Sequence, residues 1–188
     1  QILNRPPAIT EITITDPIHN TEQLTCMPIV VDADEEELSF TYLWENITKG
    51  TQIGEQETIL LNTALASVGD EIVCTATAED GMGSSVSSSV SGIVQNRAPV
   101  PPVVTLNPFP AVEGDILSCS YTTPVDEDGD SVDVSLKWLV DGLVVQNEGD
   151  TLVSVAPLDG QEVVCSLVLG DVHGAETLAN DSLIVGYI

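Results

Sequence analysis

Residues 69–74 read Gly-Asp-Glu-Ile-Val-Cys, and residues 160–165 repeat the pattern as Gly-Gln-Glu-Val-Val-Cys. Each stretch ends on the third member of a cysteine–tryptophan–cysteine triplet. The triplets are Cys26, Trp44, Cys74 and Cys119, Trp138, Cys165. Their cysteines are 48 and 46 residues apart, and the tryptophan follows the first cysteine by 18 or 19 residues. This repeat predicts two domains of the same build, each a sandwich of strands with a bridged core, in an oxidising compartment.

The repeat extends beyond the cysteines to the start of each half. Residues 4–7 read Asn-Arg-Pro-Pro, and residues 96–99 read Asn-Arg-Ala-Pro. We therefore expect one domain over residues 1–95 and a second over residues 96–188. The join at residues 95–102 contains three prolines, which predicts a semi-rigid connection.

Apolar residues alternate with polar ones in both halves. Trp44 ends such a run over residues 38–44, and Trp138 ends another over residues 132–138. Further runs contain the second cysteine of each triplet, and no window shows a sustained helical period. A period of two over short segments predicts an all-β chain of antiparallel strands with one buried face. We expect the apolar stretch 183–188 to be the last strand of its own domain; the alternative is pairing with a neighbour's sheet edge.

The triplets resemble those of tandem immunoglobulin-like domains. More narrowly, the Asn-x-Ala-Pro join and the Asp-x-Asp-Gly-Asp loop at 126–130 resemble the repeats of large bacterial surface or extracellular proteins, with joins like those of cadherins. The resemblance implies two antiparallel β-sandwiches, with the first cysteine on strand B, the tryptophan on strand C and the second cysteine on strand F. It implies the disulfides Cys26–Cys74 and Cys119–Cys165, with Trp44 and Trp138 packed against them.

Composition restricts the partners. Four basic residues stand against thirty acidic ones, for a net charge of −26. Such a chain lacks the basic patch that nucleic acid requires, and an anionic membrane surface is disfavoured for the same reason. Its apolar stretches have the length of strands, so we expect no membrane insertion. The cysteines contain no Cys-x-x-Cys spacing, which argues against a zinc site.

Acidic residues gather where the loop between strands B and C is expected. Alternate carboxylates can turn several oxygens toward one point, as calcium requires. The candidate ligands in the second half are Asp126, Asp128, Asp130 and Asp171. Weaker candidates in the first half are Asp32, Asp34, Glu36 and Asp80, since their loop lacks the counterpart of Gly129.

A bound cation would lie near the join, where it could bridge two domains. The alternative is an acidic surface loop with Arg97 as its counter-charge. We expect no cofactor other than calcium.

No residue pattern indicates catalysis. His19 and His173 are the only histidines, one in each half, and serines and aspartates are too common for a triad to be informative. We therefore expect a non-enzymatic, extracellular or cell-surface protein. The first hypothesis is a rigid structural segment of a stalk or fibre, whose partners are copies of itself or neighbouring repeats. The alternatives are an adhesin or receptor fragment that binds a glycan or protein through loop tips, and an accessory domain of a secreted enzyme.

Overall fold

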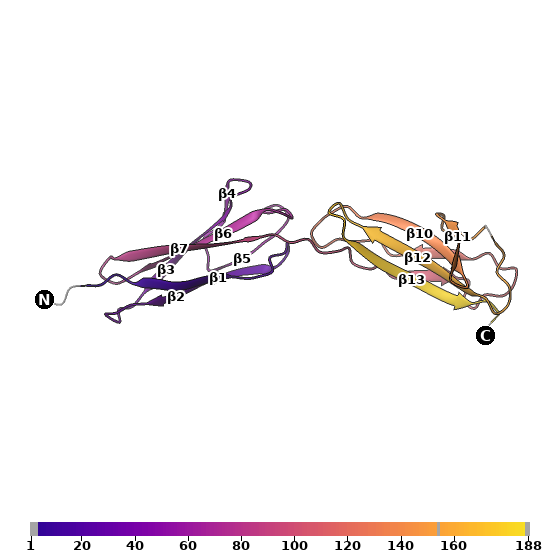
Figure 1. Ribbon diagram of the computed structural model, residues 1–188, viewed down its shortest axis with the longest axis horizontal. Helices are drawn as coiled ribbons and strands as arrows, with labels where there is room; N and C mark the ends of the chain where they lie inside the picture. Colours follow the sequence, from indigo (N-terminus) through magenta and orange to yellow (C-terminus); the bar gives the residue numbers. More distant parts are fainter. Residues whose placement is uncertain (1–3, 154, 187–188) are drawn as a thin grey trace. The chain divides into compact units, whose positions relative to one another are not determined.

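The computed structural model describes residues 4–153 and 155–186 and contains thirteen strands in two compact units that divide between Asn96 and Arg97 (Figure 1). We call the units domain 1 and domain 2 and describe each by itself. The strands of domain 1 are β1 (Ala8–Ile14), β2 (Gln23–Val31), β3 (Ser39–Asn46), β4 (Thr51–Gly54), β5 (Thr58–Leu60), β6 (Glu71–Glu79) and β7 (Ser85–Ile93). Those of domain 2 are β8 (Val104–Asn107), β9 (Ser118–Tyr121), β10 (Asp133–Val140), β11 (Leu143–Asn147), β12 (Glu162–Gly170) and β13 (Glu176–Ile184).

Domain 1 is a sandwich of two antiparallel sheets. One sheet has the order β1-β2-β5, and the other has the order β4-β3-β6-β7. The alternation expected from the sequence is complete on β6, where every second side chain from Ile72 to Ala78 is fully buried. On β7 the exposed positions of the alternation are serines and Ile93.

The core of domain 1 is built around a disulfide and a tryptophan. Cys26 of β2 and Cys74 of β6 are bonded across the two sheets, and Trp44 of β3 lies directly opposite Cys74. Trp44 is fully buried, and its indole N–H donates to the carbonyl of Gln56 at 2.8 Å. A buried indole needs such an acceptor, so the backbone after β4 is fixed by the same side chain that fills the core.

Domain 2 repeats this arrangement with fewer ladder pairs in its first sheet. Its sheets are β8-β9 and β11-β10-β12-β13. The disulfide joins Cys119 and Cys165, and Trp138 lies opposite Cys165 and donates to the carbonyl of Gly149 at 3.0 Å. The all-β immunoglobulin-like fold, both disulfide pairings and the packing of the two tryptophans are thus as the sequence predicts.

The apolar end of the chain belongs to its own domain as far as the structure describes it. Leu183 and Ile184 are the last residues of β13, where they pair with β12. This confirms the simpler expectation for these two residues, while residues 187–188 lie outside the described part. Among the described residues, no helix is long and apolar enough to span a membrane.

Candidate cation site

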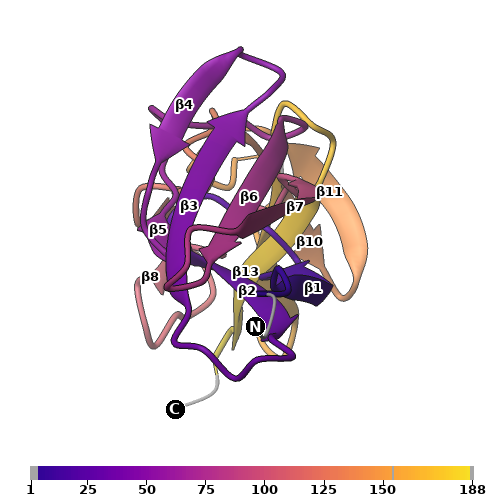
Figure 2. The same ribbon diagram turned by 90° about the vertical axis from the view of Figure 1, so that its left-hand side faces the viewer.

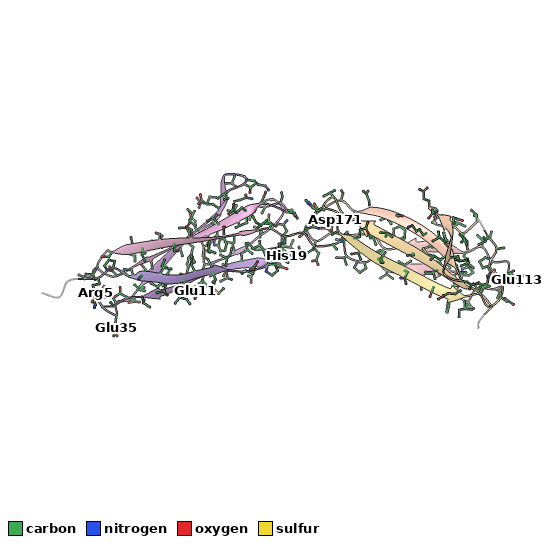
Figure 3. All side chains as sticks on the ribbon, viewed as in Figure 1. Arg5, Glu11, His19, Glu35, Glu113 and Asp171 are labelled. Carbon is green, nitrogen blue, oxygen red and sulfur yellow. A yellow bond between two sulfur atoms is a disulfide. The ribbon has the colours of Figure 1, made fainter. Side chains whose placement is uncertain are left out.

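Three segments of domain 1 meet at one end of its sandwich. They are the incoming chain at Asn4 and Arg5, the loop from β2 to β3 (residues 32–38) and the corner from β6 to β7 (residues 80–84). Figure 3 labels Arg5 and Glu35 at this end and His19 at the opposite end of the same domain. We call these segments the acidic pole of domain 1. The loops between strands B and C and between strands F and G therefore meet, as the immunoglobulin-like topology predicts.

Arg5 fixes the incoming chain to the first loop. Its backbone N–H donates to Oδ2 of Asp34 at 2.7 Å, and its Nε and Nη2 donate to Oδ1 at 3.0 and 2.7 Å. The Arg5 hydrogen bonds hold the pKa of the Asp34 carboxyl below its ordinary value. Because two guanidinium N–H groups and the backbone N–H all donate to this carboxylate, the contact is fixed in direction as well as charged. Asp34 is thereby occupied by an arginine and does not join the other acidic residues of the pole.

Three other carboxylates come together beside this contact. Asp32, Glu36 and Asp80 each place one oxygen within 4.8 Å of the others. Asp80 is 4% exposed; its Oδ1 accepts the N–H groups of Met82 and Ser84, and its Oδ2 accepts the amide of Asn4 at 3.0 Å. The Asn4 hydrogen bond, supported by those backbone N–H groups, lowers the pKa of Asp80 despite its burial.

Two oxygens of this group are inaccessible and have no hydrogen-bond partner. They are Oδ2 of Asp32 and Oε2 of Glu36. Burial raises the pKa of Glu36, and the neighbouring charges of Asp80, Asp32 and Asp34 raise it further. A carboxylate oxygen shielded from water and lacking a donor is costly, so these two oxygens are suited to a cationic partner.

Domain 2 builds the same contact with its own arginine. The backbone N–H of Arg97 donates to Oδ2 of Asp128 at 2.6 Å, and its Nε and Nη2 donate to Oδ1 at 3.1 and 2.8 Å. A further contact joins Arg97 to Glu127 at 2.9 Å. The Asp128 side chain is fully buried. Arg97 is therefore the counter-charge that the sequence suggested, but its main partner is one carboxylate rather than the whole loop.

The remaining carboxylates of domain 2 repeat the pattern of unsatisfied oxygens. Oδ2 of Asp126 and Oδ2 of Asp130 are inaccessible and lack a hydrogen bond, and Asp126 is 8% exposed. His173 Nε2 lies 3.4 Å from Oδ2 of Asp130, without hydrogen-bond geometry. Burial raises the pKa of Asp130; the charges of Asp126, Asp128 and Asp171 add to this, while His173 opposes it. We call this group, with Arg97, the acidic pole of domain 2.

The absence of a glycine does not prevent the loop of domain 1 from adopting the backbone conformation of the loop of domain 2, contrary to what the sequence suggested. Gly129 adopts the left-handed conformation with φ 83°, and its counterpart Glu35 does the same with φ 60°. A residue with a Cβ pays roughly 1 kcal/mol for that conformation, so the first loop reaches the same shape with strain. The more compact carboxylate group is in fact the one in domain 1.

Sequence reasoning missed two members of the poles. Asn4 holds Asp80, and His173 faces Asp130. The repeated Asn-Arg pair at both joins was the available signal for Asn4, because it showed that both side chains recur together with the acidic loop. His173 has no such signal, since domain 1 has Met82 at the matching position.

A hard divalent cation fits the oxygens of domain 1. Calcium binds oxygen at about 2.4 Å, so two of its ligands lie at most about 4.8 Å apart. Asp32, Glu36 and Asp80 meet that limit. Calcium takes six to eight oxygens, so about half of its shell would come from water or backbone. The acidic pole of domain 1 thus offers three carboxylates at a spacing that suits one divalent cation, beside a fixed arginine contact.

The chain matches no family model and no curated protein sequence. Among solved structures it is similar to a two fibronectin type-III domain segment from chicken tenascin, at 14% identity and TM-score 0.44, over 94% of this chain and 99% of that one. It is also similar to the N-terminal four Ig domains of Dscam1 isoform 4.44 (15% identity, TM-score 0.31, 99% and 47% covered). A third is Drosophila N-cadherin EC1-4 (14% identity, TM-score 0.32, 97% and 51% covered). The fold described above rests on this chain's own strands and disulfides.

Proposed function

We propose that this chain is a structural segment of an extracellular protein, a tandem of immunoglobulin-like repeats in a surface stalk or fibre. Both domains are closed by a buried disulfide, and disulfides persist in oxidising compartments outside the cytosol. The strongly acidic composition suits a soluble repeat that does not bind nucleic acid. The repeated join resembles those of bacterial surface proteins, which supports that setting.

We propose further that each acidic pole holds a divalent cation, calcium in the first place. The observation that carries this proposal is a repetition. Both domains place an arginine on the middle one of three alternate acidic residues, Asp34 or Asp128. The outer two, Asp32 and Glu36 or Asp126 and Asp130, each keep an inaccessible oxygen without a hydrogen bond. A carboxylate surface that served only solubility would have no reason to leave the same oxygens unsatisfied twice.

Calcium titration tests the cation. Calorimetry and thermal unfolding of the full chain in calcium, against magnesium and a chelator, should show binding and a raised Tm. Glu36→Gln should abolish the contribution of domain 1, whereas Glu37→Gln, an exposed acid outside the group, should leave it intact. If calorimetry detected no heat of calcium binding and calcium left the Tm unchanged, the proposed cation site would be wrong.

Electron microscopy of the native material tests the structural role. Ordered filaments or stalks, with a repeat near the length of one or two domains, are expected. Loss of that order in chelator would link it to the cation. Isolated two-domain particles under every condition would contradict the fibre.

We propose a non-catalytic role. His19 contacts Glu22 and His173 contacts Asp130, each at 3.4 Å, and the two histidines belong to different domains. In the described residues, the side-chain contact that each imidazole shows is therefore with a carboxylate and not with a nucleophilic side chain. Incubation with ester, glycoside and peptide substrates should give no turnover.

The alternative is a module that binds a glycan or protein through loop tips. One observation favours it: Phe109, in the loop after β8, is 78% exposed, and Ile116 in the same loop is 74% exposed. Exposed aromatic side chains often anchor ligands. Glycan-array binding that is lost in Phe109→Ala would support this role.

A further inference from the structure

Strand β7 lies at the outer end of the sheet β4-β3-β6-β7, and Figure 2 shows β3, β6 and β7 side by side in that order. It runs for nine residues, from Ser85 to Ile93, without a charged residue or a proline. An edge strand offers unpaired N–H and C=O groups to other chains, and proteins normally protect such edges with charges, proline, bulges or short length. β7 has none of these protections.

Other strand edges of the described residues are protected. β4, β8 and β9 have only four residues each, β5 has three, and β11 has five with a register shift in its pairing. β1 has a register shift between Ile9 and Glu11, and β13 contains Glu176 and Asp181. On β2, the N–H of Cys26 points away from β1, to the carbonyl of Glu57. Pro28, two residues on, therefore turns its nitrogen, which lacks a hydrogen, to the same open side.

The backbone groups on the open edge of β7 belong to its serines. Asp80 N–H donates to the carbonyl of Ser84, and Val94 N–H donates to that of Asp70, so even-numbered residues of β7 bond to β6. In an antiparallel pair the alternate residues turn outward, here Ser85, Ser87 and Ser89. β1 approaches the other end of β7, where a groove of about 300 Å³ separates residues 12–16 from residues 90–92. Residues 85–89 form the open part of the edge.

The outward side chains of this stretch are neutral and already ordered. The hydroxyl of Ser87 lies 2.7 Å from that of Thr77, and the hydroxyl of Ser89 lies 2.8 Å from that of Thr75. With a net charge of −26, two copies of this chain repel over most approaches. Residues 85–89 themselves carry no charge with which a basic foreign strand could pair. The edge is thus suited to another neutral edge.

We propose that β7 pairs with β7 of a second copy, antiparallel and about a two-fold axis near Ser87. The contact is self-complementary, as two-fold interfaces require, and joins two four-stranded sheets into one. Residues 85, 87 and 89 of one copy face residues 89, 87 and 85 of the other. The paired stretch begins directly after the corner of the acidic pole of domain 1, but its backbone groups are not cation ligands, so the pairing holds with or without a bound cation.

Sedimentation of the full chain over about 10 μM to 1 mM tests the pairing, with added salt to screen repulsion. A dimer that tightens with salt and is unaffected by chelator is expected. Ser87→Pro removes the outward N–H, together with the hydroxyl contact to Thr77, but leaves the backbone bonds to β6, and should weaken the dimer about tenfold or more. The matched control is Leu178→Pro, at the corresponding outward position of β13, and should leave the dimer unchanged.

Charged variants keep the test independent of proline effects on folding. Ser87→Lys and Ser87→Glu should each weaken self-association, because like charges then face each other across the axis. A mixture of the two should recover it, because lysine then faces glutamate. Circular dichroism and Tm verify that each variant is folded. A monomer at every concentration, a dimer indifferent to Ser87→Pro, or a mixture no tighter than either variant alone overturns the pairing.

Discussion

The two domains build the same acidic pole but different hairpins after the tryptophan strand. In domain 1, the side chain of Asn46 is fully buried at the end of β3 and donates to Oδ2 of Asp70 at 2.7 Å and to the carbonyl of Leu65 at 3.1 Å. Lys49 Nζ lies 3.3 Å from the same Asp70 oxygen. A buried polar network therefore closes the hairpin end of domain 1.

Domain 2 closes the corresponding region with apolar packing and a tighter turn. Val140 stands where domain 1 has Asn46, and Asp141-Gly142 forms a two-residue turn with φ 49° and 78°. Asp141 accepts hydrogen bonds from the side chain of Gln161 and from the N–H of Glu162 at 2.9 and 3.0 Å. Positive φ at both positions is typical of type I′ hairpins.

The comparison separates what the repeat needs from what it tolerates. The disulfide, the tryptophan and the arginine contact are arranged alike in both domains. The hairpin after the tryptophan strand is instead stabilised by a polar network in domain 1 and by apolar packing in domain 2. Each domain has one tryptophan, so Trp138→Phe leaves a fluorescence signal from domain 1 and Trp44→Phe leaves one from domain 2. These two backgrounds allow the domains to be compared within the full chain.

Removing the disulfides should have the largest effect and should affect both domains alike. The bridges close loops with separations of 48 and 46 residues. The chain-entropy model assigns each roughly 4 kcal/mol of unfolding free energy. Replacing both cysteines of one pair by alanine should destabilise only the domain that contains the pair, as measured by denaturant unfolding. A loss of similar size in the other domain would show that the domains do not unfold independently.

Replacing Arg5 in domain 1 or Arg97 in domain 2 by alanine should destabilise the two domains unequally. Arg97→Ala leaves the fully buried carboxylate of Asp128 without its main partner and should cost domain 2 about 2–3 kcal/mol. Arg5→Ala should cost domain 1 less, because its side chain is 62% exposed and that of Arg97 is 21% exposed. Equal losses of unfolding free energy in denaturant for the two variants would contradict the idea that burial of the arginine contact determines its contribution.

Breaking the buried network should affect only domain 1. Asn46→Ala removes the amide donor of the Leu65 carbonyl and one of the donors of buried Asp70, which keeps the N–H of Ser67 and Lys49, and should cost about 1–2 kcal/mol. Gln161→Ala, at the position that matches Asp70 in domain 2, should change unfolding free energy by less than about 0.5 kcal/mol. A larger loss for Gln161→Ala would reverse the comparison.

Acid should weaken domain 1 through Asp70, with the smallest of these effects. Burial opposes ionisation of Asp70, but hydrogen bonds from Asn46, the N–H of Ser67 and Lys49 prevail and lower its pKa. The ionised group therefore stabilises the fold above its unfolded pKa of about 3.9, and this stability is lost as pH falls through the lower folded value. Unfolding of Asp70→Asn should depend less on pH below about 4 than unfolding of the parent chain. Identical profiles would assign that acid sensitivity to other carboxylates.

The sequence predicted the parts of the fold that depend on periodicity. Cys74 and Cys165 stand in runs with a period of two, which placed their strands, and the tryptophan spacing placed the facing strands. The sequence also predicted that the B–C and F–G loops of each domain lie together, because immunoglobulin-like topology places both loops at one end of the sandwich. It offered Arg97 as a counter-charge but did not predict that Asp34 and Asp128 would be the carboxylates that the two arginines bind, since contacts across some thirty residues depend on how the incoming chain lies. Nor did it predict the left-handed Glu35, a conformation that local propensity disfavours.

The disulfides also determine how this chain would respond to tension. Pulling on the ends of domain 1 can extend the residues outside Cys26 and Cys74, but not those between them. The 48-residue separation corresponds to about 160 Å of extended chain that is withheld from stretching. In a stalk or fibre, a domain 1 that yields would lengthen only by the residues outside the loop, and β3, β4 and β5 would stay within it. Each repeat would then limit its own extension under load.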